Sequence, residues 1–197
     1  LYDPIISINQ IMHDKKKLIE QFLKNEDYIL SIGRLTKQKN FILLINAFHE
    51  IKKKLPEFKL VILGEGEQRK MLEKQIKTHK LQSSVFMLGY KSNVFKYIYN
   101  CKCFISSSFY EDPGFSIIES GCLNKIVIAS DSKTGPTEIL DNSKRGFLFK
   151  NNDVHSLVNK FFEFYGSKEE ILNTKKIEIK KYSKNFTLFS HYKKLRK

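Results

Sequence analysis

The stretch from Tyr28 to Gly66, YILSIGRLTKQKNFILLINAFHEIKKKLPEFKLVILGEG, predicts a strand, a helix and a second strand. Residues 28–32 and 59–63 are short runs rich in isoleucine, leucine and valine, which is typical of strands buried in a parallel sheet. Between them lie apolar residues at the three- and four-residue spacing of one helical face, namely Phe41, Leu44, Ile45, Phe48, Ile51 and Leu55. Pro56 ends that pattern. The stretch is therefore a pair of parallel strands joined by a crossover helix.

The same alternation continues along the chain. We predict strands at Tyr28–Ile32, Lys59–Leu63, Val85–Leu88, Cys103–Ser106, Ile126–Ala129 and Phe147–Phe149. Further helices are predicted at 67–78, 116–123, 136–141, 154–165, 168–182 and 187–195. The pattern indicates an α/β fold, a Rossmann-like doubly wound parallel sheet of about six strands with a C-terminal helical tail. We expect a single domain over residues 1–197, with the core at about 26–150 and the tail at about 151–197.

The composition is that of an ordinary soluble globular protein. Of the 197 residues, 41% are hydrophobic and 28% are charged. Apolar runs fall short of the roughly 18 to 20 residues that a membrane span needs, and the start of the chain does not read as a signal peptide. The three cysteines are an odd number without metal-ligand spacing, which favours a reducing cytoplasm and no metal site.

The chain is strongly basic, with 35 lysines and arginines against 21 acidic residues and a formal charge of +14. Such charge attracts nucleic acids and anionic lipid surfaces. Almost all of the excess is lysine spread along the predicted helices, without an arginine cluster or an aromatic platform. We therefore expect a solvated lysine-rich surface and no nucleic-acid partner, with weak association to an anionic membrane face as the main alternative.

Loops that follow the strands are the first place to look for a ligand site, because ligands of open α/β sheets bind beyond the carboxyl ends of the strands. The loop after the first strand places Arg34 and Lys39 beside a helix N-terminus, where backbone N–H groups and two cations suit a diphosphate. Both are alternatively plain surface charges. After the second strand, Gly64-Glu65-Gly66 begins like a dinucleotide fingerprint, but Arg69 replaces the third glycine, which favours a tight turn over an NAD site.

The fourth strand leads into SSSFYEDPGFSIIE, residues 106–119. The Pro-Gly pair predicts a turn, and the apolar residues after it predict a short helix whose free N–H groups point back at the loop. Glu111 lies in the loop, where a carboxylate accepts hydrogen bonds from sugar hydroxyls, and Glu119 lies one turn into the helix. Two plainer interpretations stay open: Glu111 as a solvated loop acid, and Glu119 in a capping box with Ser116.

The loop after the fifth strand, residues 130–138, opens another helix with Pro136 suited to the first turn. Thr134 or Gly135 could present backbone amides to a ligand. Glu138 is explained equally well as an acid stabilised by a helix N-terminus.

Five elements follow one another along the chain: Gly33-Arg34-x4-Lys39, Gly64-x-Gly66, Phe86-Met87-Leu88-Gly89-Tyr90, Glu111-x7-Glu119 and Gly135-Pro136-x-Glu138. Their order and spacing resemble the family-4, or group 1, glycosyltransferases, whose GT-B architecture has two Rossmann-like domains. The resemblance covers about the whole chain. It implies that the chain is the C-terminal domain, which binds the nucleotide-sugar donor.

The resemblance also implies roles for particular residues. In similar enzymes paired basic residues hold the donor diphosphate, here Arg34 and Lys39, and we take these with Glu111 as the catalytic residues. The first glutamate contacts the transferred sugar and the second the ribose hydroxyls, here Glu111 and Glu119. The backbone of residues 114–116 would meet the sugar and phosphates, and the base would pack at Tyr90. The donor-binding set implied is Gly33, Arg34, Lys39, Gly64, Tyr90, Lys91, Glu111, Gly114, Phe115, Ser116 and Glu119.

The implied activity is retaining transfer of a hexose or N-acetylhexosamine from a nucleoside-diphosphate sugar, with UDP favoured, to a glycan or lipid-linked acceptor in cell-envelope polysaccharide biosynthesis. No metal is implied, which agrees with the lack of an Asp-x-Asp motif, and no cofactor, because the nucleotide sugar is a substrate. We expect a cytoplasmic location with peripheral contact to the inner face of the membrane.

In similar enzymes an N-terminal acceptor-binding domain precedes a linker that ends like Leu1-Tyr2-Asp3-Pro4-Ile5. We therefore expect that domain to be absent from this chain, and the chain alone to bind donor with little transfer. The predicted helix at 187–195 resembles the segment that returns to the absent domain.

The chain departs from the family pattern in two places. Relatives often read Glu-Gly-Phe-Pro-Asn where this chain has residues 111–115, EDPGF, so the backbone around the sugar is expected to differ. Relatives carry glycine near Asn124, and asparagine can adopt the left-handed conformation that glycine would supply. Two other function classes stay open: a non-catalytic basic module that binds nucleic acid or anionic membrane, and a sugar-nucleotide epimerase or phosphorylase of the same architecture.

Overall fold

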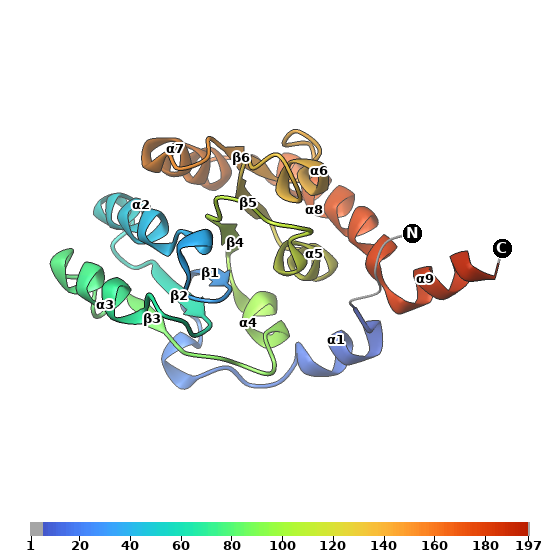
Figure 1. The fold of residues 1–197 in the computed structure, drawn as a ribbon, viewed down its shortest axis with the longest axis horizontal. Coiled ribbons are helices and arrows are strands. Elements are labelled where there is room, and N and C mark those ends of the chain that lie inside the picture. Colours follow the sequence, from blue (N-terminus) through green and yellow to red (C-terminus); the bar gives the residue numbers. More distant parts are fainter. Residues whose placement is uncertain (1–5, 197) are drawn as a thin grey trace.

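The computed structural model describes residues 6–196, so the linker-like start at 1–5 lies outside the described residues. Six parallel strands form one sheet in the order β3-β2-β1-β4-β5-β6 (Figure 1). Their bounds are β1 Tyr28–Ile32, β2 Lys59–Leu63, β3 Val85–Met87, β4 Cys103–Ser106, β5 Val127–Ser130 and β6 Phe147–Phe149. This is the strand order of a doubly wound Rossmann-like sheet, which confirms the predicted fold class.

The predicted bounds are wrong for two of the six strands, β3 and β5. β3 stops at Met87, one residue earlier than predicted, and β5 is shifted one residue toward the C-terminus. Ile126 is buried but lies outside the β5 ladder, so apolar burial extends further than strand pairing there. An apolar run marks the buried segment, whereas the pairing partners determine where the ladder begins and ends.

The helices alternate with the strands as predicted, with two additions. Their bounds are α1 Ile8–Asp14, α2 Phe41–Lys54, α3 Arg69–Thr78, α4 Phe95–Asn100, α5 Phe115–Cys122, α6 Pro136–Leu140, α7 Val154–Tyr165, α8 Glu169–Ser183 and α9 Leu188–Leu195. Short 3-10 turns occur at Gln21–Leu23, Lys37–Lys39 and Lys184–Phe186. Helices α1 and α4 were not predicted, because seven and six residues are too few to show a helical period and neither begins with a proline as the short α6 does.

Two apolar cores lie on opposite faces of the sheet. One core contains side chains of α2, α3 and α7 together with one face of the strands, and the other contains side chains of α1, α4, α5 and α6 with the opposite face. Figure 1 shows α2, α3 and α7 on one side of the sheet and α4 and α5 on the other. Alternate residues of β1 divide between the cores, with Ile29 in the first and Leu30 in the second, as the two-residue period of a strand requires.

The C-terminal helices are part of these cores. Leu157, Phe161 and Phe164 of α7 are buried in the first core, and Ile179 of α8 is buried in the second. Phe161 meets the ring of Phe58 edge-on at 5.7 Å between ring centroids. No helix within residues 6–196 has the length and apolar character needed to cross a membrane.

Candidate functional site

Two adjoining cavities lie at the carboxyl ends of β1, β2 and β4. The first, of about 350 Å³, is lined by Ile32, Gly33, Arg34, Thr36, Gln38, Lys39, Glu111, Asp112, Gly114, Phe115, Ser116 and Glu119. The second, of about 500 Å³, is lined by Ile32, Gly33, Arg34, Leu63, Gly64, Glu65, Tyr90, Lys91 and Val94. The three shared residues show that the cavities meet at the end of β1. Together they contain all eleven residues of the predicted site, whose roles in binding stay predictions.

Close contact between the loops after β1 and β2 depends on glycine. Gly64 has φ +141°, and a Cβ on it would lie 1.9 Å from the carbonyl oxygen of Gly33. The Leu35 N–H donates to the carbonyl of Glu65 at 2.9 Å, which joins the two loops backbone to backbone. A side chain at Gly64 would force them apart. The two glycines after β2 therefore make a tight turn beside the second cavity, in agreement with the interpretation favoured over an NAD site.

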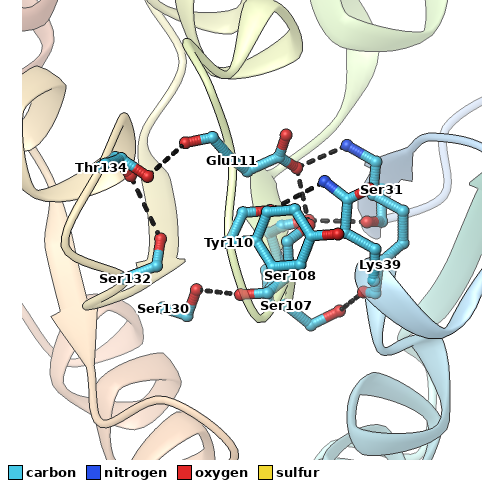
Figure 2. Close-up of polar contacts among 11 residues, drawn as sticks. Ser31, Lys39, Ser107, Ser108, Tyr110, Glu111, Ser130, Ser132 and Thr134 are labelled. Carbon is cyan, nitrogen blue, oxygen red and sulfur yellow. Dashed lines mark hydrogen bonds and ion pairs between the residues drawn. The ribbon is translucent and has the colours of Figure 1, made fainter.

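Lys39 and Glu111 are bonded to each other in the first cavity. Their Nζ and Oε1 atoms are 2.5 Å apart, and the Ser108 hydroxyl donates to the same oxygen at 2.6 Å (Figure 2). Glu111 is only 7% exposed, so its interpretation as a solvated loop acid is wrong. Burial of a carboxylate is stable here because a cation and a hydroxyl compensate it.

Arg34 has the opposite environment to Lys39. Its side chain is exposed, and its guanidinium has no hydrogen bond or ion pair within residues 6–196. Lys39 instead packs along the backbone, since a Cβ on Gly33 would come within 2.9 Å of its Cε. Of these two cations of the site, Lys39 is therefore paired with a carboxylate and Arg34 is not, within residues 6–196.

Helix α5 begins directly at the cavity. Its N-cap is Gly114, with φ +85°, and no side chain caps its first N–H groups. Ser116 is thus inside the first turn, and the capping-box interpretation of Glu119 is wrong. The free N–H groups and the positive end of the helix dipole favour an anion at this end of α5.

Glu119 lies on the same helix and lines the same cavity. Burial raises the pKa of its carboxyl from 4.5 to about 7, since desolvation disfavours the charged form. No lysine or arginine within the described residues pairs with it, unlike Glu111. Its carboxyl is therefore harder to ionise than that of a solvated glutamate.

Tyr90 and Lys91 form the rim of the second cavity. Tyr90 is 78% exposed. The Lys91 ammonium donates to Glu20 at 3.1 Å, and the Tyr97 hydroxyl donates to the same carboxylate oxygen. Burial opposes charge on Glu20, but the hydrogen bonds from Tyr97 and Lys91 outweigh it and lower its pKa. The prediction placed Lys91 at the site but missed the acid that holds it.

Some contacts within the site were missed because their partners are distant in the sequence. The Thr134 hydroxyl donates to the carbonyl of Glu111 at 3.0 Å, and the Gln38 amide donates to the carbonyl of Tyr110 at 3.0 Å. Thr134 and Gly135, expected to offer amides to a ligand, line neither cavity. The available signal was a series of small hydroxyl residues after buried strands, at the edge where the loops meet.

These features define the class of the molecule: a Rossmann-like α/β domain whose ligand-sized cavities lie at the carboxyl edge of a doubly wound sheet. The family model described as glycosyl transferases group 1 matches residues 13–184. The chain belongs to that family.

Similar proteins include an uncharacterized glycosyltransferase of Methanocaldococcus jannaschii, 40% identical over 125 residues, which are 64% of this chain and 31% of that protein. A Campylobacter jejuni N-acetylgalactosamine-N,N'-diacetylbacillosaminyl-diphospho-undecaprenol 4-alpha-N-acetylgalactosaminyltransferase is 37% identical over 72% of this chain and 38% of its own length.

Among solved structures, a Staphylococcus aureus TarM variant in complex with fondaparinux, alpha-GlcNAc-glycerol and UDP matches with a TM-score of 0.77 and 26% identity, over 86% of this chain and 34% of that one. The chain thus spans about a third of the length of these three proteins.

Proposed function

We propose that this chain is the donor-binding half of a retaining glycosyltransferase that moves a hexose or N-acetylhexosamine from a UDP-sugar to a glycan or lipid-linked acceptor. The observation that carries the proposal is the gathering of two cations, two glutamates and an uncapped helix N-terminus around two joined cavities. The family membership supports transfer, and the UDP in the TarM complex supports the choice of base. The sugar class follows the Campylobacter relative, named for N-acetylgalactosamine transfer.

The cavities suggest how a donor would lie. We assign the diphosphate to Arg34, Lys39 and the N-terminus of α5, because these supply the positive charge. The sugar then meets Glu111 and the ribose hydroxyls meet Glu119. The base enters the second cavity beside Tyr90, and the ends of β1 and β2 also line this cavity.

The same groups account for the departure of UDP. Breaking the bond between sugar and phosphate leaves negative charge on the diphosphate, and cations already in place stabilise that charge without reorganising. We propose that Arg34, Lys39 and the α5 dipole perform this role and that transfer requires no bound metal. Most of each relative lies outside the matched region, and we assign acceptor binding to that part.

Calorimetry with UDP, GDP, ADP and their sugar conjugates tests the proposal. We expect UDP and UDP-sugars to bind, and the substitution Arg34→Ala to weaken UDP about tenfold by removing a charged contact to phosphate. Arg34 is the suitable position because it is exposed and unpaired, so its removal strands no buried charge. Lys37→Ala is the matched control, since Lys37 is an exposed cation of the same loop as Arg34 and lies outside both cavities. The absence of nucleotide binding by the folded chain, or equal effects of both substitutions, would contradict the proposal.

A separate surface favours contact with an anionic membrane. Lys15, Lys16, Lys17 and Lys24 line a hollow of about 480 Å³, and the adjacent Leu18 side chain is 88% exposed. Clustered lysines beside an exposed apolar side chain are typical of binding at a lipid interface. We propose that this surface holds the domain near lipid-linked acceptors.

Vesicle sedimentation tests the membrane contact. The chain should sediment with phosphatidylglycerol vesicles and stay in solution with phosphatidylcholine vesicles, and Leu18→Ser should weaken the first interaction. Equal sedimentation with both vesicle types would count against this surface, as would tighter binding to duplex DNA.

A further inference from the structure

One oxygen of Glu111 has its full number of hydrogen bonds. Its Oε1 atom accepts from the Lys39 ammonium at 2.5 Å and from the Ser108 hydroxyl at 2.6 Å. A carboxylate oxygen has two lone pairs, so two donors saturate it. The Oε2 atom has no hydrogen-bond partner within residues 6–196, and Figure 2 shows it pointing away from both donors. Only this second oxygen is left to accept from a ligand.

The main chain on either side of this carboxylate is held in place. The carbonyl of Glu111 accepts from the Thr134 hydroxyl at 3.0 Å, and a Cβ on Gly135 would lie 2.7 Å from that carbonyl oxygen. The carbonyl of Ser108 accepts from the Ser130 hydroxyl at 2.5 Å. With the backbone fixed at both ends, rotation of the Glu111 carboxylate is the remaining freedom.

Two adjacent buried serines act on different partners. Ser108 donates to the Glu111 carboxylate, whereas Ser107 donates to the main-chain carbonyl of Lys39 at 2.8 Å. Each serine is 1% exposed. Neither lines the cavities, so neither would touch a bound donor. Their effects on a ligand must therefore pass through Glu111 and Lys39 respectively.

We propose that Ser108 is a positioning residue for sugar recognition: together with Lys39 it occupies one oxygen of Glu111 and turns the other toward the sugar of the donor. The inference rests on the proposed function, which assigns the sugar to Glu111. Lys39 keeps further N–H donors for the diphosphate, so it joins the sugar and phosphate parts of the site. Ser108 has no such second role, and its effect is confined to the sugar.

The test compares donors with and without a sugar. UDP, UDP-glucose, UDP-N-acetylglucosamine and UDP-N-acetylgalactosamine are titrated into the unaltered chain and into the variants Ser108→Ala and Ser107→Ala. We expect Ser108→Ala to raise the Kd of the tightest of these UDP-sugars about tenfold and the Kd of UDP less than about twofold. The substitution removes the hydrogen bond that holds Glu111, and in the proposed function Glu111 contacts the sugar and not the UDP part of the donor. Ser107→Ala is matched in burial and size, and should leave the ratio of the two Kd values unchanged.

The outcomes separate the inference from the proposed function. Parallel loss of UDP and UDP-sugar affinity in Ser108→Ala, or the same change of ratio in Ser107→Ala, would overturn the positioning role while leaving donor binding intact. If the unaltered folded chain binds neither UDP nor a UDP-sugar, the proposed function itself fails. Should Ser108→Ala not fold, Ser108→Cys keeps nearly the same volume with only a weak donor, and must then show the sugar-specific loss.

Discussion

At the scale of single residues, two glutamates separated by seven residues have opposite electrostatic environments. The Glu111 carboxylate is buried, and its ion pair with Lys39 and its hydrogen bond from Ser108 compensate for the loss of water. Glu119 is partly buried without a cation, and its pKa rises to about 7. Both side chains line the same cavity, but only Glu111 has an ion pair with Lys39. Burial therefore makes Glu119 costly to charge, whereas Glu111 is paired with a cation.

Substitution of Glu119 should reveal that cost through its pH dependence. Between about pH 4.5 and 7 the folded chain keeps a proton on Glu119 that the unfolded chain has released, so stability falls as pH rises through this window. The substitution Glu119→Gln removes the titrating carboxyl and with it this loss of stability at higher pH. We expect the variant to be more stable than the original chain by about 1 to 2 kcal/mol at pH 8, with little difference at pH 4, after allowing for partial exposure. Urea unfolding at both pH values measures this.

The exposed Glu170 of α8 provides the control. Glu170→Gln should change stability little at either pH, because the residue is solvated in the folded chain. A gain for Glu119→Gln that is equal at pH 4 and pH 8 would show that the carboxyl is not desolvated. In the proposed function the same variant should also bind UDP less tightly, through loss of the charged ribose contact.

At the scale of elements, α5 links the site to the sheet by the way it starts and ends. It starts at Gly114, where the left-handed backbone brings its N–H groups to the cavity. It ends in a Schellman motif, with Asn124 N–H bonded to Gly121 and Lys125 N–H bonded to Ser120. Asn124 has φ +62°, which confirms the left-handed conformation expected for an asparagine in place of glycine.

The stability of variants at Asn124 should follow how easily each residue adopts a positive φ. We expect Asn124→Ala to destabilise the domain by about 1 kcal/mol and Asn124→Gly to be neutral or slightly stabilising. The matched position is Asn173, an exposed residue inside α8, where helix propensity should reverse the order and make alanine the better residue. Thermal unfolding of the four variants measures both orders. The same order at both positions would rule out backbone conformation as the cause.

At the scale of the whole molecule, the two apolar cores are completed by helices from the C-terminal quarter. Phe161 of α7 and Ile179 of α8 are fully buried on opposite faces of the sheet. Helix α9, in contrast, has no buried residue. The residues after 150 therefore differ in importance: α7 and α8 close the cores, and α9 lies on the surface.

Shortened chains test this division. A chain that ends at residue 150 exposes both cores and should lose cooperative unfolding, whereas one that ends at Thr187 should keep it. Circular dichroism during urea unfolding distinguishes the two. A cooperative transition for the chain ending at 150 would show that the sheet and its first helices suffice.

The sequence alone determined the class of fold and four strands with their correct ends, and the eleven residues that it proposed for the site all line the cavities. It could do so because buried strands and crossover helices leave local periodic patterns, and parallel strands bring the loops after them to one edge. It also indicated the left-handed end of α5, since that conformation restricts residue type locally.

Only the tertiary structure decided how the site residues interact. The bond between Lys39 and Glu111 spans 72 positions, and the contact from Thr134 to Glu111 spans 23. No local pattern encodes such pairs, because they depend on which strands lie side by side and how closely glycines let loops approach. The same reason explains why Glu111 is buried rather than solvated, and why Ser108, an ordinary loop serine in the sequence, holds its carboxylate.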